Sequence, residues 1–295
     1  MTYKTHLASA KAKFWVISRL VGGGENPKMF TKQSQSAKTA HNAQWTDKLE
    51  QIVMYLPQAN RGRQLFDELA SPRLIKLWTT MQGKHRNVCS HATPGCRAAC
   101  LGNSGHLGIS GGAASRAMLA RYVMLCLFPY DFWLLVDYEI GLAKKRVGRC
   151  GKTLVCRING TSDLDVVTEA YVGDESILSR HPDVDFQDYT KRPLVRSGWR
   201  TTVPNYYLVR SATERDDRAM FDEHQGNIVV PVNLPKGAAL PDTFMGRPVI
   251  DGDVHDLRCA DTPRDERGNY AVLVRVKKRT DGKRPDTHGF IREVV

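Results

Sequence analysis

From residue 152 onward, short apolar runs alternate with short helical stretches, and this alternation constrains the fold more than any other feature. β-Branched and apolar residues predict strands at 153–158, 184–187, 206–209, 228–230, 248–250 and 271–276. Helices are predicted at 169–180 and 215–224. Strands that alternate with helices form βα units and a parallel sheet. Right-handed crossovers then allow a doubly wound sheet or a barrel, complete or partial.

The first half of the chain is predicted to be mainly helical. Two short helices separated at Pro72 and two long helices separated at Pro129 are expected, over residues 65–81, 113–128 and 132–146. Aromatic and β-branched residues predict a strand at 14–18, before a glycine-rich turn, and 31–44 is predicted to be exposed or mobile. We expect a basic N-terminal region, residues 1–84, packed on a main domain, residues 85–295.

Polar side chains follow the predicted strands where each strand ends. The carboxyl ends of parallel strands meet at one edge of a sheet, where binding sites form. One such cluster is often only a helix N-cap, but four in succession favour a shared pocket. We therefore predict these substrate-binding residues: Asn159, Thr161, Asp163, Asp188, Thr190, Lys191, Ser211, Asp251 and Asp253. The last two could also bind a divalent cation, although an acidic turn with glycine is often only a turn.

Three cysteines lie within twelve residues, at Cys89, Cys96 and Cys100. Thiolates that converge on a loop bind zinc or an iron–sulfur cluster, whereas the alternative is three small buried side chains. Structural zinc sites usually contain C-x2-C pairs, which this segment lacks. The spacing C-x6-C-x3-C therefore favours a [4Fe–4S] cluster with one open iron. Zinc, with a nearby histidine as a further ligand, stays an alternative, and either Cys156 or Cys259 could be a fourth ligand.

The charge of the chain is positive and unevenly distributed. The net charge is +12, and residues 1–88 contribute 14 Lys and Arg against 5 Asp and Glu, or 14 − 5 = +9. Such a region can attract nucleic acid or another polyanion, although a solvated basic surface is the alternative. The sequence contains neither a membrane-spanning apolar run nor a secretory signal, and its seven cysteines are an odd number. We expect an intracellular protein without a disulfide framework.

No local pattern identifies a catalytic residue. The sequence lacks a G-x-S-x-G elbow, an H-E-x-x-H motif and a P-loop. Cysteine, histidine and aspartate are all present, but nothing local links them as a triad. The catalytic residues are therefore unknown from sequence.

Several segments together resemble the bacteriophage gene product 88 family. The resemblance rests on residues 89–102, 157–163, 181–191, 204–211 and 249–258, and it covers roughly residues 85–276. It implies a phage-encoded protein that works in the host cytoplasm. The chain is also similar, more distantly, to radical S-adenosylmethionine (SAM) enzymes. This second resemblance implies a partial (β/α) barrel and a three-cysteine [4Fe–4S] loop. Those enzymes usually carry C-x3-C-x2-C and a Gly-Gly-Glu-like segment, and this chain departs from both patterns.

These observations lead to two functional hypotheses. The first is a phage-encoded iron–sulfur protein with a radical-SAM-like partial barrel and a helical or irregular basic N-terminal region. It would act on nucleic acid or a nucleotide, and the open iron could bind SAM. The second is a non-catalytic phage protein in which a zinc or iron–sulfur site stabilises a surface that binds nucleic acid or a host protein.

Overall fold

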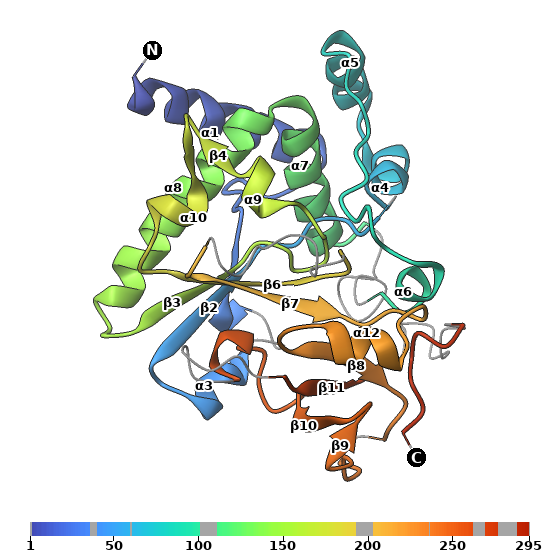
Figure 1. Ribbon diagram of the computed structural model, residues 1–295. Helices are drawn as coiled ribbons and strands as arrows, with labels where there is room; N and C mark the ends of the chain where they lie inside the picture. The colour runs from blue at the N-terminus through green and yellow to red at the C-terminus, as the bar shows by residue number, and fades with distance from the viewer. Residues whose placement is uncertain are drawn as a thin grey trace.

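A mixed sheet forms the centre of the molecule (Figure 1). The computed structural model describes residues 2–35, 40–59, 61–100, 111–192, 203–235, 237–261, 269–276 and 288–294. Within these ranges the sheet has nine strands in the order β1-β2-β3-β6-β7-β8-β11-β10-β9. Its strands are β1 (Thr31–Lys32), β2 (Leu49–Val53), β3 (Thr153–Arg157), β6 (Asp185–Thr190), β7 (Tyr206–Ser211), β8 (Ile228–Val232), β9 (Thr243–Phe244), β10 (Arg247–Asp251) and β11 (Ala271–Arg275).

The sheet is parallel except at its two edges. Strands β2, β3, β6, β7 and β8 are neighbours in chain order and run parallel, and β11 and then β10 continue the parallel sheet. The register places Val53 beside Arg157 and Thr190 beside Arg210. The edge strands β1 and β9 pair antiparallel. The predicted α/β fold with a parallel sheet is therefore confirmed, and no pairing among the described residues closes it into a barrel.

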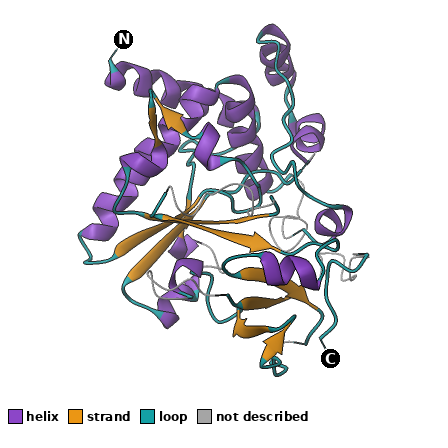
Figure 2. Ribbon diagram, viewed as in Figure 1, coloured by secondary structure: helices purple, strands orange, loops and turns teal. Residues whose placement is uncertain are grey.

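Three long helices cover one face of the sheet. They are α1 (Tyr3–Leu20), α7 (Ala113–Leu127) and α8 (Pro129–Gly148), and Figure 2 shows them together on one side of the strands. Cys156, Phe186 and Leu208 of the sheet belong to the same buried apolar cluster as Phe14 and Phe132 of these helices. The expected long helices at 113–128 and 132–146 are confirmed, with the second beginning at Pro129. Proline at the first helical position is favoured because its missing N–H has no partner there.

The predicted strand at 14–18 is wrong, because these residues lie within α1. Leu7, Ala10, Phe14 and Ile17 recur three or four residues apart, and all four are buried. This spacing places them on one face of a helix. Packing of that face against α7 and α8 outweighs the β propensity of the Phe-Trp-Val-Ile sequence.

The shorter elements follow the prediction less closely. The break at Pro72 separates α4 (Arg61–Leu69) from α5 (Pro72–Thr80), as expected. The predicted helix at 169–180 is wrong, because Gly173 adopts φ 65 and turns the chain into a hairpin. The remaining elements are α3 (Asn42–Trp45), α6 (Pro94–Ala98), α9 (Val166–Glu169), α10 (Ile177–Arg180), α12 (Arg218–Glu223), β4 (Tyr171–Val172), β5 (Glu175–Ser176), η1 (Gln33–Gln35) and η5 (Arg258–Ala260).

The second face of the sheet is covered by a loop rather than by long helices. Residues 252–261, which include η5, pack beside Val155 and Tyr207 of the sheet. Helix α3 lies on this side too (Figure 1). Strand β2 falls within the expected N-terminal region, yet it pairs with β3, so the sheet crosses the predicted boundary at residue 84. Among the described residues, no helix has the length and apolarity needed to cross a membrane.

Candidate functional site

A cavity of about 270 Å³ lies at the carboxyl ends of the parallel strands. The three clustered cysteines line it, together with residues that follow β3, β6, β7 and β10. Six of the nine predicted substrate-binding residues take part in its lining: Asn159, Thr161, Asp163, Lys191, Ser211 and Asp253. The structure thus brings the cysteine loop and most of the polar strand ends to one place.

The cysteine loop is held in place by a carboxylate that follows strand β7. Thr93 caps α6 by accepting from the N–H of Cys96 at 3.3 Å. Its hydroxyl donates to Glu214 Oε2 at 2.5 Å, and the N–H of Gly95 donates to Glu214 Oε1 at 3.0 Å. Burial acts to raise the pKa of Glu214, but these two hydrogen bonds outweigh it and the pKa falls. Glu214 therefore stays ionised and connects the end of β7 to the loop.

The three cysteines are reduced and differ in their surroundings. None forms a disulfide, and each is partly buried. Cys89 Sγ donates to the carbonyl of Thr161 at 3.4 Å. Burial raises the pKa of Cys89 to about 12, and the neighbouring Cys100, Asp163 and Cys96 add to the effect. Cys89 is therefore a thiol at neutral pH, and a metal that binds it must displace the proton.

A lysine ammonium lies between the cysteines and the strand ends. Lys191 Nζ donates to Ser211 Oγ at 3.1 Å, and it is hydrogen-bonded to the Cys96 side chain. Burial acts to lower the pKa of Lys191, but the charges of Cys96 and Asp163 and the hydrogen bond with Cys96 outweigh it, so the pKa rises. Lys191 thus places a positive charge beside the cysteine loop.

A buried carboxylate supports the loop after β3. Asp188 accepts from the N–H of Asn159 at 2.6 Å, from Asn159 Nδ2 at 3.2 Å and from the hydroxyl of Tyr206 at 3.1 Å. Asn159 Oδ1 in turn accepts from the hydroxyl of Ser162 and the N–H of Leu164. Burial raises the pKa of Asp188 to about 7, although hydrogen bonds from Asn159 and the charge of Arg157 act against it. Asp188 therefore shapes the cavity from beneath and does not line it.

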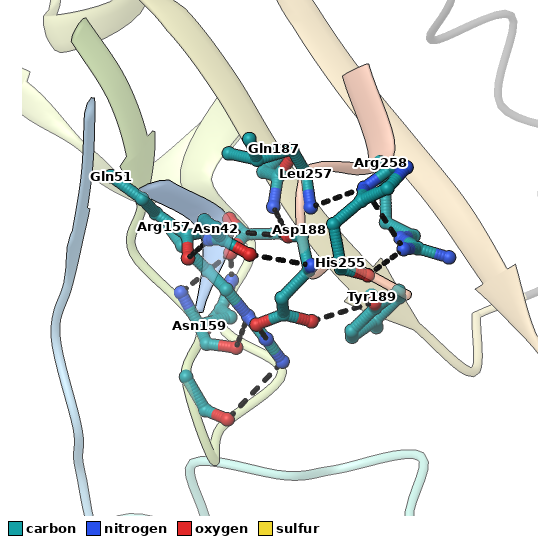
Figure 3. Close-up of polar contacts among 12 residues, drawn as sticks. Asn42, Gln51, Arg157, Asn159, Gln187, Asp188, Tyr189, His255, Leu257 and Arg258 are labelled. Atoms are coloured by element: carbon teal, nitrogen blue, oxygen red, sulfur yellow. Dashed lines mark hydrogen bonds and ion pairs between the residues drawn. The ribbon is translucent and has the colours of Figure 1, made fainter. Parts of the chain in front are cut away.

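A buried ion pair joins the end of β3 to the loop over the second face. Arg157 Nη1 lies 3.0 Å from Asp256 Oδ2, and the Arg157 guanidinium lies 4.5 Å from the centre of the Tyr189 ring. Gln51 and Gln187 both donate to the carbonyl of Asp256. Figure 3 shows Arg157, Gln187 and Tyr189 converging on this loop beside His255 and Leu257. These contacts form one wall of the cavity.

Three predicted substrate-binding residues do not line the cavity. Asp188 is buried beneath Asn159, and Thr190 Oγ1 accepts from the N–H of Arg192 at 3.1 Å. Asp251 accepts from Arg275 Nη1 at 2.9 Å, and Asp253 accepts from the same nitrogen at 3.1 Å. Arg275 therefore pairs with both carboxylates, and the divalent-cation site that the acidic turn allowed stays a prediction.

Sequence reasoning missed several residues that shape the site. Glu214 lies a few residues after the predicted strand at 206–209, but no local pattern indicated that it holds a loop 119 residues away. Arg157 and Asp256 are 99 residues apart, and Arg275 was assigned only to a strand. The one sequence signal that could have indicated these residues was the presence of charged side chains in or next to predicted buried strands. Such residues are almost never fully buried unless they are paired.

The three cysteine side chains lie near one another, since Cys100 and Cys96 both raise the pKa of Cys89. Within the described ranges, no three His, Cys, Asp or Glu side chains are arranged so that they could hold a metal ion. Two candidate further ligands, Cys156 and Cys259, lie in buried apolar clusters. Of the histidines near the loop that could supply a ligand, His85 stacks on Trp78, His91 is exposed, and His106 lies outside the described residues. Zinc and an iron–sulfur cluster both stay predictions for this loop.

Comparison with known proteins identifies the family. Residues 27–293 match the family profile described as gene product 88. The chain belongs to the gene product 88 family. The match confirms the resemblance inferred from five segments and extends it to β1 and β2. No curated protein and no solved structure matches the chain. The more distant likeness to radical SAM proteins receives no support from these comparisons. In this gene product 88 family member, the matched region includes the cysteine loop and the whole sheet, whereas α1 precedes it.

The contact between Glu214 and the cysteine loop can be tested by thiol reactivity. Glu214→Ala removes both hydrogen bonds at the start of α6, so we expect metal-free Cys96 to react with iodoacetamide several-fold faster. Peptide mass spectrometry measures the rate at Cys96. The control is Glu223→Ala, an exposed residue of α12, which should leave that rate unchanged. Equal rates in all three proteins would show that Glu214 does not hold the loop.

The buried Asp188 predicts a pH dependence of stability. Unfolded aspartate releases its proton near pH 4, whereas Asp188 in the folded protein keeps it up to about pH 7. The folded state therefore binds more protons between these values, and stability falls as pH rises through this window.

Asp188→Asn removes this titration, so the free energy of unfolding of the wild type should fall relative to the variant between pH 4 and pH 7. Urea denaturation at several pH values measures it. Asp174→Asn, in the exposed β4–β5 turn, should follow the wild type. A constant difference between wild type and Asp188→Asn at all pH values would contradict the prediction.

Proposed function

We propose that Cys89, Cys96 and Cys100 hold a [4Fe–4S] cluster and that this family member is an iron–sulfur enzyme acting on a nucleotide or nucleic acid. The observation that carries the proposal is that three reduced cysteines line one cavity at the carboxyl ends of a parallel sheet. Open α/β sheets bind ligands at this edge. The host cytoplasm, where thiols stay reduced, is the compartment that suits such a site.

The donor set suits a cluster better than a single ion. A cluster binds each cysteine at a different iron, so the three sulfurs need not meet at one point. No fourth cysteine is among the described residues that line the cavity. When bound, a three-cysteine cluster has one iron without a protein thiolate, and that iron can bind a ligand and exchange an electron. The Lys191 ammonium would offset the negative charge of the thiolates.

The order of the elements supports a radical-SAM-like assignment for the cluster. The cysteine loop follows β2, the first strand of the parallel sheet, and β3, β6, β7 and β8 follow in order across the sheet. This is the arrangement expected of a partial (β/α) barrel with its cysteine loop at the mouth. SAM is therefore a candidate ligand of the open iron. The chain departs from that pattern in its cysteine spacing, in the absence of a Gly-Gly-Glu-like segment and in the reversed order of β10 and β11.

Other cavity residues would position the substrate. Asp163 Oδ2 accepts from the N–H of Lys191 at 3.1 Å, and the N–H of Asp163 donates to the carbonyl of Val88. These bonds tie Asp163 to the cysteine loop and to the end of β6. Its carboxylate can accept from the amino or hydroxyl groups of a nucleotide, while Lys191 and Arg97 offer positive charge in the same cavity.

Metal analysis tests the cluster directly. Protein purified without oxygen should be brown and contain about four irons with matching sulfide. Cys89→Ser, Cys96→Ser and Cys100→Ser should each lose most of the iron, because each removes one of three protein ligands. Cys150→Ser, an exposed residue outside the cavity, is the control and should keep it. A colourless wild-type protein with one zinc would contradict the proposal.

Binding of SAM separates the enzyme from a non-catalytic binding protein. We expect cluster-loaded wild type to bind SAM in equilibrium dialysis, and Asp163→Ala to weaken this binding at least tenfold with the iron content unchanged. Asp174→Ala, in the exposed β4–β5 turn, should behave as wild type. If iron-loaded wild type does not bind SAM, the radical-SAM-like assignment fails. A cluster that stabilises a binding surface is then the better description.

A further inference from the structure

The chain contains a long segment without acidic residues. No Asp or Glu occurs between Glu68 and Asp131, although this stretch includes α5, the cysteine loop and α7. Its cations are Arg73, Lys76, Lys84, Arg86, Arg97, Arg116 and Arg121. They contribute +7 of the net charge of +12. The basic character of the protein is therefore concentrated in the chain that leads into and out of the cavity.

Three of these cations are committed to the fold. Arg121 is buried and donates to the carbonyls of Lys28 and Tyr55. Arg116 donates to the carbonyls of Val21 and Gly111, and Arg86 pairs with Glu169. Arg73, Lys76 and Lys84 lie on α5 or just after it, and Arg97, which also has a contact within the protein, lines the cavity.

Helix α5 presents a basic and apolar face to solvent. Its inner face is formed by the buried Leu74 and Trp78. The outer face carries Arg73, Ile75 and Lys76, all exposed, and Ile75 is 49% accessible. Met81 and Lys84 continue the exposed surface just after the helix. We call Arg73, Ile75, Lys76, Met81 and Lys84 the α5 ridge.

The α5 ridge leads toward the cavity. Figure 1 shows α5, α4 and α6 following one another down one side of the molecule to the ends of the strands. Arg97, on α6, lines the cavity, and Lys191 lies within it. Basic residues therefore occur both on the exposed helix α5 and at the proposed reaction site, while the cations of α4 between them are paired with Asp67 and Glu68.

We propose that the α5 ridge and Arg97 bind the phosphodiester backbone of a single-stranded nucleic acid and guide one nucleotide into the cavity. This inference rests on the proposed function, because it takes the cavity as the reaction site. Proteins that bind single strands combine a positively charged surface that follows the backbone with aromatic side chains on which bases stack, and the α5 ridge supplies the first of these. Ile75 and Met81 supply apolar surface between the cations. A flexible chain with one charge per residue can follow this path into a cavity, whereas a folded acidic protein cannot.

The size of the cavity favours a single strand over a duplex. About 270 Å³ is near the lower end of the range of small-ligand pockets, which is roughly 300–1,000 Å³. Such a space does not admit a base pair. An enzyme that acts on a base must take that base out of a duplex or act on a single strand.

Fluorescence anisotropy with labelled oligonucleotides of a dozen residues tests the inference. The probes are oligo(dT), oligo(U) and a DNA duplex of the same length. The test variant combines Arg73→Gln, Lys76→Gln and Lys84→Gln. The control combines Lys4→Gln, Lys145→Gln and Arg149→Gln, which removes the same charge from exposed positions on α1 and at the end of α8. Circular dichroism and thermal melting establish that each variant is folded.

We expect wild type and control to bind single strands within twofold of each other, and the ridge variant to bind at least tenfold more weakly. The loss of three contacts with phosphates should reduce the magnitude of the slope of log K against log salt concentration by about 2. The duplex should bind more weakly than either strand. The two single-stranded probes distinguish DNA from RNA as the preferred strand.

Three results would overturn the inference: equal binding by the ridge variant and wild type, tighter binding of the duplex, or equally effective competition by poly-glutamate. The last would indicate an acidic protein partner instead. Iron analysis of the same preparations separates this inference from the proposed function. If wild type contains iron but binds no oligonucleotide, the inference fails and the proposed cluster stands. If wild type contains no iron but binds single strands, the proposed cluster fails and the inference stands.

Discussion

The buried pair between Arg157 and Asp256 is the interaction on which the site depends most. Arg157 ends β3, and its guanidinium also donates to the carbonyls of Asn159 and Gly160, so it fixes the turn that carries the polar residues of the cavity. Asp256 fixes the loop over the second face. Removing one partner of such a pair typically costs 3–5 kcal/mol, because the other charge stays buried without compensation. The pair therefore couples the stability of the sheet to the shape of the cavity.

Two further contacts bring distant segments to the same edge. Asp188 supports the loop after β3 from within the neighbouring strand, and Glu214 holds the cysteine loop from the end of β7. The parallel sheet makes both contacts possible, because consecutive strands end side by side. The cysteines thus occupy a surface built from four strand ends. Helix α6, which carries only Cys96, is too short to fix the loop alone.

The sequence predicted the parts of the fold that periodicity determines. Helices α7 and α8 and strands β3, β7, β8 and β11 follow local patterns. Strand β2 was missed because Glu50 and Gln51 interrupt its apolar pattern, and Gln51 is buried through its bonds to Asn42 and Asp256. At the site, the rule that parallel strands end together anticipated which segments would meet. It could not reveal that Arg275 neutralises Asp251, because that pairing joins positions 24 residues apart on adjacent strands.

The distance in sequence between Glu214 and the cysteine loop affects how the protein matures. Thr93 and Glu214 are separated by 121 residues, and the three thiols leave the ribosome long before β7 can pair with its neighbours. During synthesis the loop is therefore exposed, reduced and free of its carboxylate partner. A domain generally folds as a unit, once the chain that it requires has been synthesised. A metal carrier or an oxidant would consequently meet these cysteines first in the nascent chain, and the order of synthesis sets a period in which the site can be filled or damaged.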